Sequence, residues 1–342
     1  MNAKIWDYIN LMSHIRPLRF VNLIQVYFSY YWSKWRGKAN MWGSPASISI
    51  EPTTACNLGC PECPSGLKKF TRAEGNLKEG FLTDLFGQLK NSLFYVTFYF
   101  QGEPFIHPKF LELVREAKKQ KLYTATSTNA HFLNDKQAKK TVESGLDRLI
   151  ISIDGTTQES YEQYRVNGKL EKVIEGTKNI IHWKKELNSK TPYVIFQFLV
   201  VRHNEHQIEN VKELGKKLGV DEVKFKTAQL YDYKNGNELM PKNEKFSRYK
   251  KDTNGTFSIK NPLDNQCWRM WQGCVLTWDG LVVPCCFDKD AEHQMGDLKE
   301  NDFKEVWNSK NYNQFRSSIL KSRSEIDICT NCTEGTKVWE EV

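Results

Sequence analysis

The nine cysteines of this 342-residue chain limit its possible folds more than any other feature. An odd number of cysteines does not make a closed disulfide set, and the N-terminus lacks a signal-peptide pattern, so we expect reduced thiols in a cytoplasmic protein. The cysteines form two groups with a long cysteine-free stretch between them: Cys56, Cys60 and Cys63, and then Cys267, Cys274, Cys285, Cys286, Cys329 and Cys332. This distribution predicts two separate metal sites.

Composition excludes several classes of protein. Hydrophobic residues make up 39% of the chain and charged residues 26%, which is ordinary for a globular protein and excludes collagen-like, coiled-coil and disordered chains. No apolar run is long enough for a membrane-spanning helix. The net charge of +8 is modest for this length, so we expect no nucleic-acid partner.

Strand-like and helix-like segments alternate through residues 46–233. This alternation predicts βαβ units around a parallel sheet, arranged either as a doubly wound sheet or as an incomplete barrel. The polar motifs follow the strands directly, at the carboxyl ends where such sheets place their sites. The expected strands are residues 46–51, 94–100, 123–128, 148–153, 193–200 and 222–227.

The chain divides into four expected parts. Residues 1–45 form an aromatic and basic arm, and residues 46–233 form the α/β region. Residues 234–262 are polar and rich in turn residues, which is typical of a linker. Residues 263–342 contain a hairpin pattern around Asp279-Gly280 and two short helical patterns, so we expect a small α+β module with six cysteines.

The first cysteine group has the spacing C-x3-C-x2-C in the loop after the first expected strand. Three thiolates on one short loop can hold a four-iron cluster and leave one iron open to another ligand. A structural zinc site needs four protein ligands. Cys56, Cys60 and Cys63 therefore predict an iron–sulfur site, with a chance grouping or a zinc site completed by a distant residue as the alternatives.

Over residues 46–230 this pattern resembles the radical SAM superfamily. The resemblance implies a partial (β/α)6 TIM barrel with a 4Fe-4S cluster on Cys56, Cys60 and Cys63. It also implies that the open iron binds S-adenosyl-L-methionine (SAM) and that an electron donor such as flavodoxin or ferredoxin drives SAM cleavage. The resulting 5′-deoxyadenosyl radical removes a hydrogen atom from the substrate.

Further motifs carry the same resemblance. Gln101-Gly102-Glu103-Pro104 is similar to the family's Gly-Gly-Glu-Pro motif, which holds the methionyl ammonium group. Arg165 resembles an arginine that reaches the SAM carboxylate. The resemblance implies SAM contacts at Gly102, Glu103, Ser127, Asn129, Ser152, Asp154 and Arg165.

Two positions depart from the family pattern, and some of the implied contacts have a simpler interpretation. Glu62 stands where an aromatic residue often covers the adenine, and Gln101 replaces the first glycine of the motif. Ser152 and Asp154 could instead cap the turn after a strand, and Glu103 could belong to a plain turn.

The second cysteine group offers four thiolates at Cys267, Cys285, Cys329 and Cys332, which could form a zinc ribbon or a closed iron–sulfur cluster. With Trp278-Asp279-Gly280 and Val306-Trp307-Asn308, it resembles the SPASM/twitch module. The resemblance implies one auxiliary 4Fe-4S cluster for electron transfer. A purely structural cluster is the alternative, and Cys286 competes with Cys285 as a ligand.

Cys274 and Cys286 remain outside this ligand set. Each is either a small buried hydrophobic residue or a hydrogen-atom donor to a substrate radical, and a donor would produce epimerisation.

The arm of residues 1–45 contains ten aromatic residues, and the segment from Phe20 to Ser33 carries no charge. Lys34, Arg36 and Lys38 follow directly. Two interpretations are open. The arm packs across the barrel with its tryptophans in the core, or it lies at the inner membrane surface as an interfacial helix.

Together these patterns predict a radical SAM enzyme that dehydrogenates or epimerises a small sugar-, cyclitol- or lipid-like molecule. A radical SAM peptide maturase is the second candidate. A zinc-stabilised binding protein without catalytic activity is the third.

Overall fold

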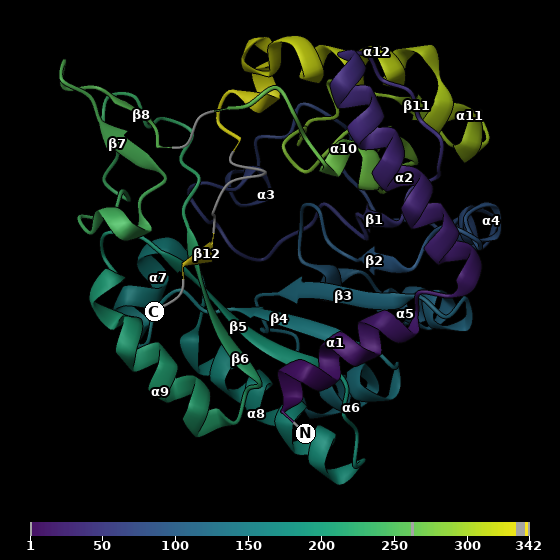
Figure 1. Cartoon of the computed structure of the whole chain (residues 1–342). Helices are drawn as coiled ribbons and strands as arrows, with labels where there is room; N and C mark the ends of the chain where they lie inside the picture. Colours follow the sequence, from purple (N-terminus) through teal and green to yellow (C-terminus); the bar gives the residue numbers. More distant parts are fainter. Residues whose placement is uncertain (1, 261–262, 333–338, 341–342) are drawn as a thin grey trace. The chain divides into compact units, whose positions relative to one another are not determined.

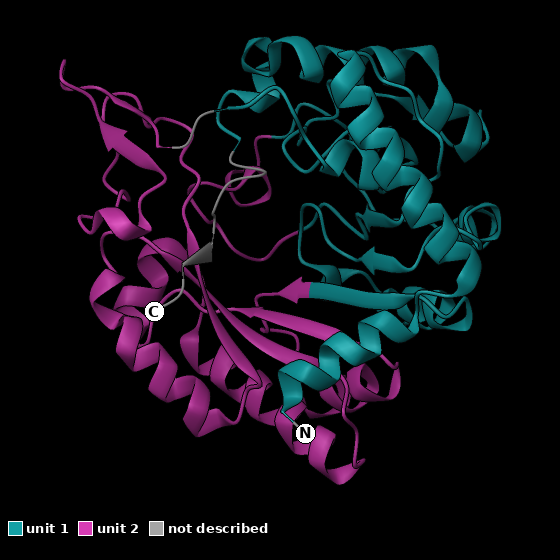
Figure 2. Ribbon diagram, viewed as in Figure 1, with its two compact units in different colours: residues 1–55, 70–126, 263–335 teal, residues 56–69, 127–262, 336–342 magenta. Residues whose placement is uncertain are grey.

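The computed structural model describes residues 2–260, 263–332 and 339–340, and the chain forms two compact units (Figure 2). Unit 1 consists of residues 1–55, 70–126 and 263–335, and unit 2 consists of residues 56–69, 127–262 and 336–342. Each unit is assembled from stretches far apart in the sequence, whereas the predicted domains are continuous. The predicted domain boundaries stay a prediction.

Unit 1 contains a sheet with the strand order β11-β10-β9-β1-β2-β3 (Figure 1). Strands β9, β1, β2 and β3 are parallel, and β10 and β11 are antiparallel additions. The strands are β1 (Ser47–Ile50), β2 (Tyr95–Thr97), β3 (Tyr123–Thr128, whose last two residues belong to unit 2), β9 (Gly273–Leu276), β10 (Leu281–Val283) and β11 (Gly296–Asp297). The helices are α1 (Ala3–Ser13), α2 (Pro17–Arg36), α4 (Phe81–Gln88), α5 (Phe110–Lys119), α10 (Arg269–Gln272), α11 (Phe303–Asn308) and α12 (Lys310–Ser322).

Strand β9 joins the cysteine-rich C-terminal segment to the first strand of the chain. It runs parallel to β1, with Gly273 opposite Ser47 and Leu276 opposite Ile50. A Cβ atom at Gly273 would lie 2.1 Å from the carbonyl oxygen of Ser47, so the close approach of the two strands requires glycine at this position. The C-terminal segment is therefore part of the same sheet as β1.

Unit 2 contains the strand order β4-β5-β6-β12, in which β4, β5 and β6 are parallel and β12 is antiparallel to β6. Strand β5 is almost entirely buried and rich in β-branched and aromatic residues, as parallel sheets covered on both faces require. The elements are β4 (Arg148–Ser152), β5 (Tyr193–Val200), β6 (Glu222–Thr227), β12 (Trp339–Glu340), α3 (Pro64–Leu67), α6 (Asp135–Glu143), α7 (Gln158–Tyr164), α8 (Leu170–Glu186) and α9 (Ile208–Leu218).

Helix ends in unit 2 follow local chemistry. The side chain of Asn134 accepts a hydrogen bond from the amide of Gln137 and begins α6, and Thr157 begins α7 in the same way. Gly219 adopts a left-handed conformation and ends α9. The segment predicted as a linker contains a two-stranded sheet of β7 (Tyr249–Lys251) and β8 (Phe257–Ile259).

The predicted fold class is confirmed. The structure is α/β, with parallel strands that alternate with helices and with a small α+β region at the C-terminus. Strands β3, β5 and β6 have the bounds expected from the sequence, and β1, β2 and β4 are shorter by one or more residues at their ends.

Candidate functional site

The first cysteine group lies in the loop before α3, in unit 2. Cys60 is buried, and Cys56 and Cys63 are half-buried. The loop rests on an apolar cluster that includes Leu58, Tyr164 and Leu230, and the three cysteines pack against it. This apolar support holds the loop in place while Cys56 and Cys63 stay partly exposed.

Glycine allows the loop to fold tightly. The amide of Gly59 donates a hydrogen bond of 2.9 Å to the carbonyl oxygen of Val166. A Cβ atom at Gly66 would lie 2.5 Å from the backbone nitrogen of Cys60, so any side chain at Gly66 would displace the loop. Cys63 precedes the first residue of α3, Pro64.

Arg165 links the predicted SAM residue Asp154 to the cysteine loop. Its Nε donates to Asp154 Oδ2 at 2.6 Å, and its Nη1 lies 3.6 Å from the sulfur of Cys60. Asp154 is fully buried, and its Oδ1 accepts a hydrogen bond from the amide of Leu199. Burial acts to lower the pKa of Arg165, but the Asp154 carboxylate and Cys60 raise it, so Arg165 keeps its charge. Burial raises the pKa of the Cys60 thiol, and Arg165 opposes this effect.

Asn129, another predicted SAM residue, is tied to the same loop. Its Nδ2 donates to Asn57 Oδ1 at 2.8 Å. His131 Nδ1 lies 2.9 Å from the carbonyl oxygen of Asn129, and His131 Nε2 accepts from the amide of Lys169. Burial lowers the pKa of His131, which favours the neutral ring that these bonds require. Asn57 and His131 were not among the predicted residues, because no local pattern marks a hydrogen bond across the sheet edge.

Ser127, Ser152 and Glu62 also belong to unit 2. The hydroxyl groups of Ser127 and Ser152 lie 3.5 Å apart at the ends of β3 and β4. Glu62, which departs from the family pattern, accepts a hydrogen bond of 2.8 Å from the amide of Tyr231. Glu62 therefore holds the segment that follows β6.

The predicted SAM residues Gly102 and Glu103 belong to unit 1. Gly102 has a φ of 73°, and a Cβ atom there would lie 2.2 Å from the carbonyl oxygen of Thr53. The amide of Glu103 donates a hydrogen bond of 2.8 Å to the carbonyl oxygen of Ala55, the residue before Cys56. The buried Glu103 carboxylate also accepts from the amide of Phe105, so it caps the following turn as the simpler interpretation expects.

The second cysteine group lies in unit 1. Cys329 and Cys332 are buried, and Cys267 and Cys285 are half-buried. The buried side chain of Arg323 donates to the sulfur of Cys332 at 3.3 Å. Burial raises the pKa of Cys329 to about 11, and Cys332 adds to the effect. Burial also raises the pKa of Cys285, with contributions from Cys286, Cys267 and Cys332.

The donor sets fit the two clusters that the sequence predicts, because thiolates are the ligands of iron–sulfur clusters. Among residues 2–260, 263–332 and 339–340, no group of three or more Cys, His, Asp or Glu side chains is arranged as a metal site. The assignment of individual ligands stays a prediction.

Cys274 and Cys286 differ in their surroundings. Cys274 is buried in β9, where burial raises its pKa to about 12. Cys286 packs against an apolar cluster of Phe100, Val275, Val283 and Ala291.

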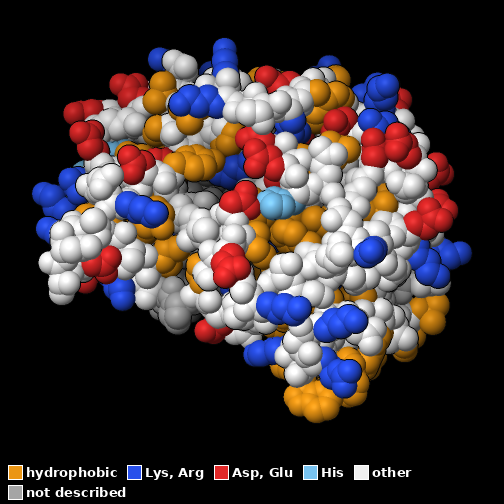
Figure 3. Space-filling view, turned by 90° about the horizontal axis from the view of Figure 1, so that it is seen from above, with side chains coloured by type: hydrophobic (Ala, Val, Ile, Leu, Met, Phe, Trp, Pro, Cys, Tyr) orange, Lys and Arg blue, Asp and Glu red, His pale blue; other side chains and the backbone are white. Residues whose placement is uncertain are grey.

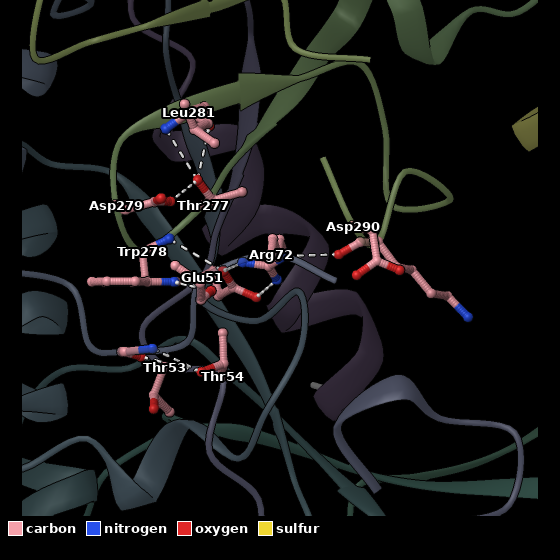
Figure 4. Close-up of polar contacts among 12 residues, drawn as sticks. Glu51, Thr53, Thr54, Arg72, Thr277, Trp278, Asp279, Leu281 and Asp290 are labelled. Carbon is pink, nitrogen blue, oxygen red and sulfur yellow. Dashed lines mark hydrogen bonds and ion pairs between the residues drawn. The ribbon is translucent and has the colours of Figure 1, made fainter. Parts of the chain in front are cut away.

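A buried ion pair connects β1 to the segment after α3 and to the cysteine-rich region, all within unit 1 (Figure 4). Arg72 makes two hydrogen bonds to the fully buried Glu51, at 2.6 and 2.9 Å. The amide of Trp278 donates to the same carboxylate, and Arg72 Nε donates to the carbonyl oxygen of Lys289. Asp290 accepts from the amide of Thr71. Segments before and after the first cysteine group are thereby fastened to the C-terminal region.

Unit 1 also contains a polar cavity of about 260 Å³. Five of its lining residues carry a hydroxyl group, and these five alternate along β1 and the β2 segment. Its lining includes Ser47, Ser49, Tyr95, Thr97, Tyr99, Arg269, Gln272, Cys274 and Cys285. No sequence motif marks this cavity, although the alternation of Tyr95, Thr97 and Tyr99 indicates that one face of the strand carries hydroxyl groups.

Comparisons with known proteins agree with this picture. Residues 50–215 match the model of the Radical SAM superfamily, and residues 267–333 match SPASM, an iron-sulfur cluster-binding domain. A tungsten-containing aldehyde ferredoxin oxidoreductase cofactor-modifying protein of Pyrococcus furiosus is 24% identical over 317 residues, which cover 84% of this chain and 86% of that protein.

Solved structures share the fold at low identity. BtrN in complex with AdoMet and 2-DOIA has a TM-score of 0.52 and 17% identity, with 86% of this chain and 95% of that chain covered. SuiB of Streptococcus suis bound to S-adenosylmethionine has a TM-score of 0.62 and 15% identity, with 86% and 73% covered. The two cysteine groups, the α/β fold and the two family matches lead to one conclusion: the chain belongs to the radical SAM superfamily and carries a C-terminal SPASM-type iron–sulfur module.

Proposed function

We propose that the protein is a radical SAM oxidoreductase or epimerase that acts on a small hydroxylated molecule. The polar cavity of unit 1 carries this proposal. Its volume of about 260 Å³ lies just below the usual range of drug-sized ligand pockets, which favours a sugar- or cyclitol-sized substrate over a peptide. Its Ser, Thr and Tyr hydroxyl groups and the Arg269 guanidinium offer donors and acceptors for a polyol.

Cofactor binding follows from the donor sets. Cys56, Cys60 and Cys63 would hold the SAM-binding 4Fe-4S cluster, and Cys267, Cys285, Cys329 and Cys332 would hold the auxiliary 4Fe-4S cluster. When bound, the first cluster and SAM supply a 5′-deoxyadenosyl radical, and the auxiliary cluster supplies electron transfer. Gly102, Glu103, Ser127, Asn129, Ser152, Asp154 and Arg165 would bind SAM.

The protein residues contribute orientation and protons. Arg165 keeps its positive charge beside Asp154, so it can bind a carboxylate. Cys274 stays protonated, which a hydrogen-atom donor for epimerisation requires, and a dehydrogenase would not need it. Its pairing with Ile48 directs its side chain to the face of the sheet opposite Ser47 and Ser49, so a donor role would require the substrate to reach that face. Cys286, in its apolar cluster, is the weaker candidate.

Two features of the proposal concern partners. A flavodoxin or ferredoxin would supply electrons. We place the enzyme peripherally at the inner membrane surface through residues 1–45, and none of the helices that the structure describes is long and apolar enough to cross a membrane.

A peptide maturase is the second candidate, because SuiB, which shares the fold, has been solved bound to its precursor peptide SuiA. A panel of polyols, sugars, aminocyclitols and short peptides separates the two candidates. We expect a hydroxylated small molecule to increase 5′-deoxyadenosine formation above the uncoupled background.

The cavity is tested by Thr97→Val, which removes one hydroxyl group and preserves the side-chain shape. We expect a loss of substrate-dependent turnover with unchanged uncoupled SAM cleavage. Thr253→Val, at an exposed turn position, is the matched control. Stimulation by peptides alone, or full turnover by Thr97→Val, would contradict the small-molecule proposal.

A further inference from the structure

Helix α2 has an inverted distribution of polarity. Polar side chains occupy much of its buried face, on which Arg19, Asn22, Ser29 and Ser33 are all buried. Large apolar side chains occupy the opposite face and are 40–74% exposed: Leu18, Phe20, Val21, Ile24, Tyr27, Phe28, Tyr31, Trp32 and Trp35. A surface helix whose outer face contacts water has its apolar side chains on the buried face and its polar side chains on the exposed face.

Helix α1 repeats the pattern. Its one buried residue is Asp7, which accepts a hydrogen bond from the hydroxyl of Tyr123. Its exposed face carries Ile5, Tyr8, Ile9 and Met12, which are 53–62% exposed and follow helical spacing. The two helices are separated by a short turn, and each presents exposed apolar residues.

Polar contacts hold α2 firmly in this orientation. The buried guanidinium of Arg19 donates to the carbonyl oxygens of His14, Lys90, Gln120 and Lys121 at 2.7–3.2 Å. Asn22 exchanges two hydrogen bonds of 2.8 Å with the backbone of Ser44. Rotating the helix to bury its apolar face would break all of these bonds, so the exposed face is a fixed property of unit 1.

The exposed charges of the arm itself have one sign. Asp7 is the only acidic residue among residues 1–45, and it is buried. The exposed cations Lys4, Arg16, Lys34, Arg36 and Lys38 stand at the ends of the two helices. The ring of Trp32 lies 5.2 Å from the ring of Trp35 and 6.2 Å from that of Trp42, both in tilted arrangements, near the cations at the C-terminal end of α2 in the sequence. Figure 3 shows hydrophobic side chains at the surface next to Lys and Arg side chains, at the lower edge of the view.

We propose that the exposed faces of α1 and α2 bind the surface of an anionic lipid bilayer. An apolar face with tryptophan and tyrosine at its edge enters the interface between headgroups and acyl chains, and flanking cations pair with anionic lipid. The single sign of the arm's exposed charges favours this partner over a second copy of the chain, whose matching arm would bring like charges together. The inference develops the peripheral location proposed above and does not depend on the reaction.

The test is flotation of the full chain, with both clusters reconstituted, on phosphatidylcholine vesicles and on vesicles of phosphatidylcholine and phosphatidylglycerol. We expect binding to the anionic vesicles that weakens at high salt. Phe28→Glu/Trp35→Glu places two charges on the apolar face and should weaken this binding by about tenfold or more. Leu187→Glu/Gln314→Glu adds the same charge at exposed positions outside the arm and should bind like the original protein.

A second variant separates charge from apolar contact. Arg16→Gln/Arg36→Gln/Lys38→Gln should lose the preference for anionic vesicles by about tenfold or more. Iron content and circular dichroism confirm that each variant is folded. The proposal fails if the original protein does not bind vesicles, or if Phe28→Glu/Trp35→Glu binds them equally. It also fails if light scattering shows that the original protein is a dimer, that Phe28→Glu/Trp35→Glu is a monomer, and that neither protein binds vesicles. Turnover of soluble substrate is measured separately, so failure here leaves the proposed reaction intact.

Discussion

Burial decides the chemistry of Cys274. The residue is buried in β9, and its pKa is raised to about 12 because burial disfavours the thiolate. A thiol that keeps its proton retains the hydrogen atom that an epimerase would have to deliver. The same property makes Cys274 a poor nucleophile.

We therefore predict that Cys274 resists alkylation. At pH 8 the fraction of thiolate is about a thousandfold lower than for an ordinary cysteine, since each pKa unit changes it tenfold. Iodoacetamide labelling followed by peptide mass spectrometry measures the rate, and the urea-denatured chain is the control. Equal rates in the folded and denatured chains would show that the thiol is ionised and accessible.

Cys56, Cys60 and Cys63 allow a direct test of the first cluster. Replacing all three by Ala should leave only the auxiliary cluster, about four irons per chain, and should abolish SAM cleavage under dithionite. Iron analysis measures the number of irons per chain, and 5′-deoxyadenosine formation measures SAM cleavage. Persistent 5′-deoxyadenosine formation by the triple variant would refute the assignment.

At the scale of elements, one buried ion pair, Glu51 with Arg72, connects the end of β1 to two loops of unit 1. Glu51, at the end of β1, holds Arg72 and the backbone of Trp278, and Arg72 in turn holds the backbone of Lys289. The segments on either side of the first cysteine loop and the turn after β9 therefore share one buried ion pair (Figure 4).

Glu51→Gln should destabilise the protein by about 3 kcal/mol, because it leaves the Arg72 guanidinium buried without its counter-charge. Glu79→Gln, in the exposed ion pair with Lys109, is the matched control and should cost less than about 1 kcal/mol. Urea unfolding of both variants gives the difference. Equal unfolding midpoints would mean that the buried pair contributes no more than a surface pair.

At the scale of the whole molecule, the chain returns to its first strand near its end. Strand β9 extends the sheet next to β1, and the two cysteine groups belong to different compact units. The SPASM-type region is thus not a detachable appendage, because unit 1 uses its strands to complete a sheet.

Gly273→Ala tests this junction. Its Cβ atom would meet the carbonyl oxygen of Ser47, so we expect a loss of stability of about 1–3 kcal/mol and a lower auxiliary iron content. Gly87→Ala is the control, because this exposed helical position in α4 has no atom within 4 Å of the added methyl group and should gain about 0.5–1 kcal/mol. Thermal unfolding and iron analysis measure both effects. A Gly273→Ala variant as stable as Gly87→Ala would show that β9 can leave β1 without cost.

Local patterns in the sequence determined the family, the α/β fold class and the positions of the six expected strands, three of them to the residue. Cys56, Cys60 and Cys63 lie within eight consecutive residues, and the periodicities of strands and helices repeat over short stretches of sequence. Both patterns can therefore be recognised without a structure. The aromatic arm was visible too, but its two interpretations could not be separated, because composition does not tell which side of a helix is buried.

Only the tertiary structure decided how distant segments meet. It exposed Trp32 and Trp35 where one interpretation of the arm expected core residues, and it buried Arg19 instead. It also paired Ser47 with Gly273. These outcomes depend on contacts between residues tens to hundreds of positions apart. Periodicity within one segment carries no information about them, because the partner that a face meets is set by the packing of the whole unit.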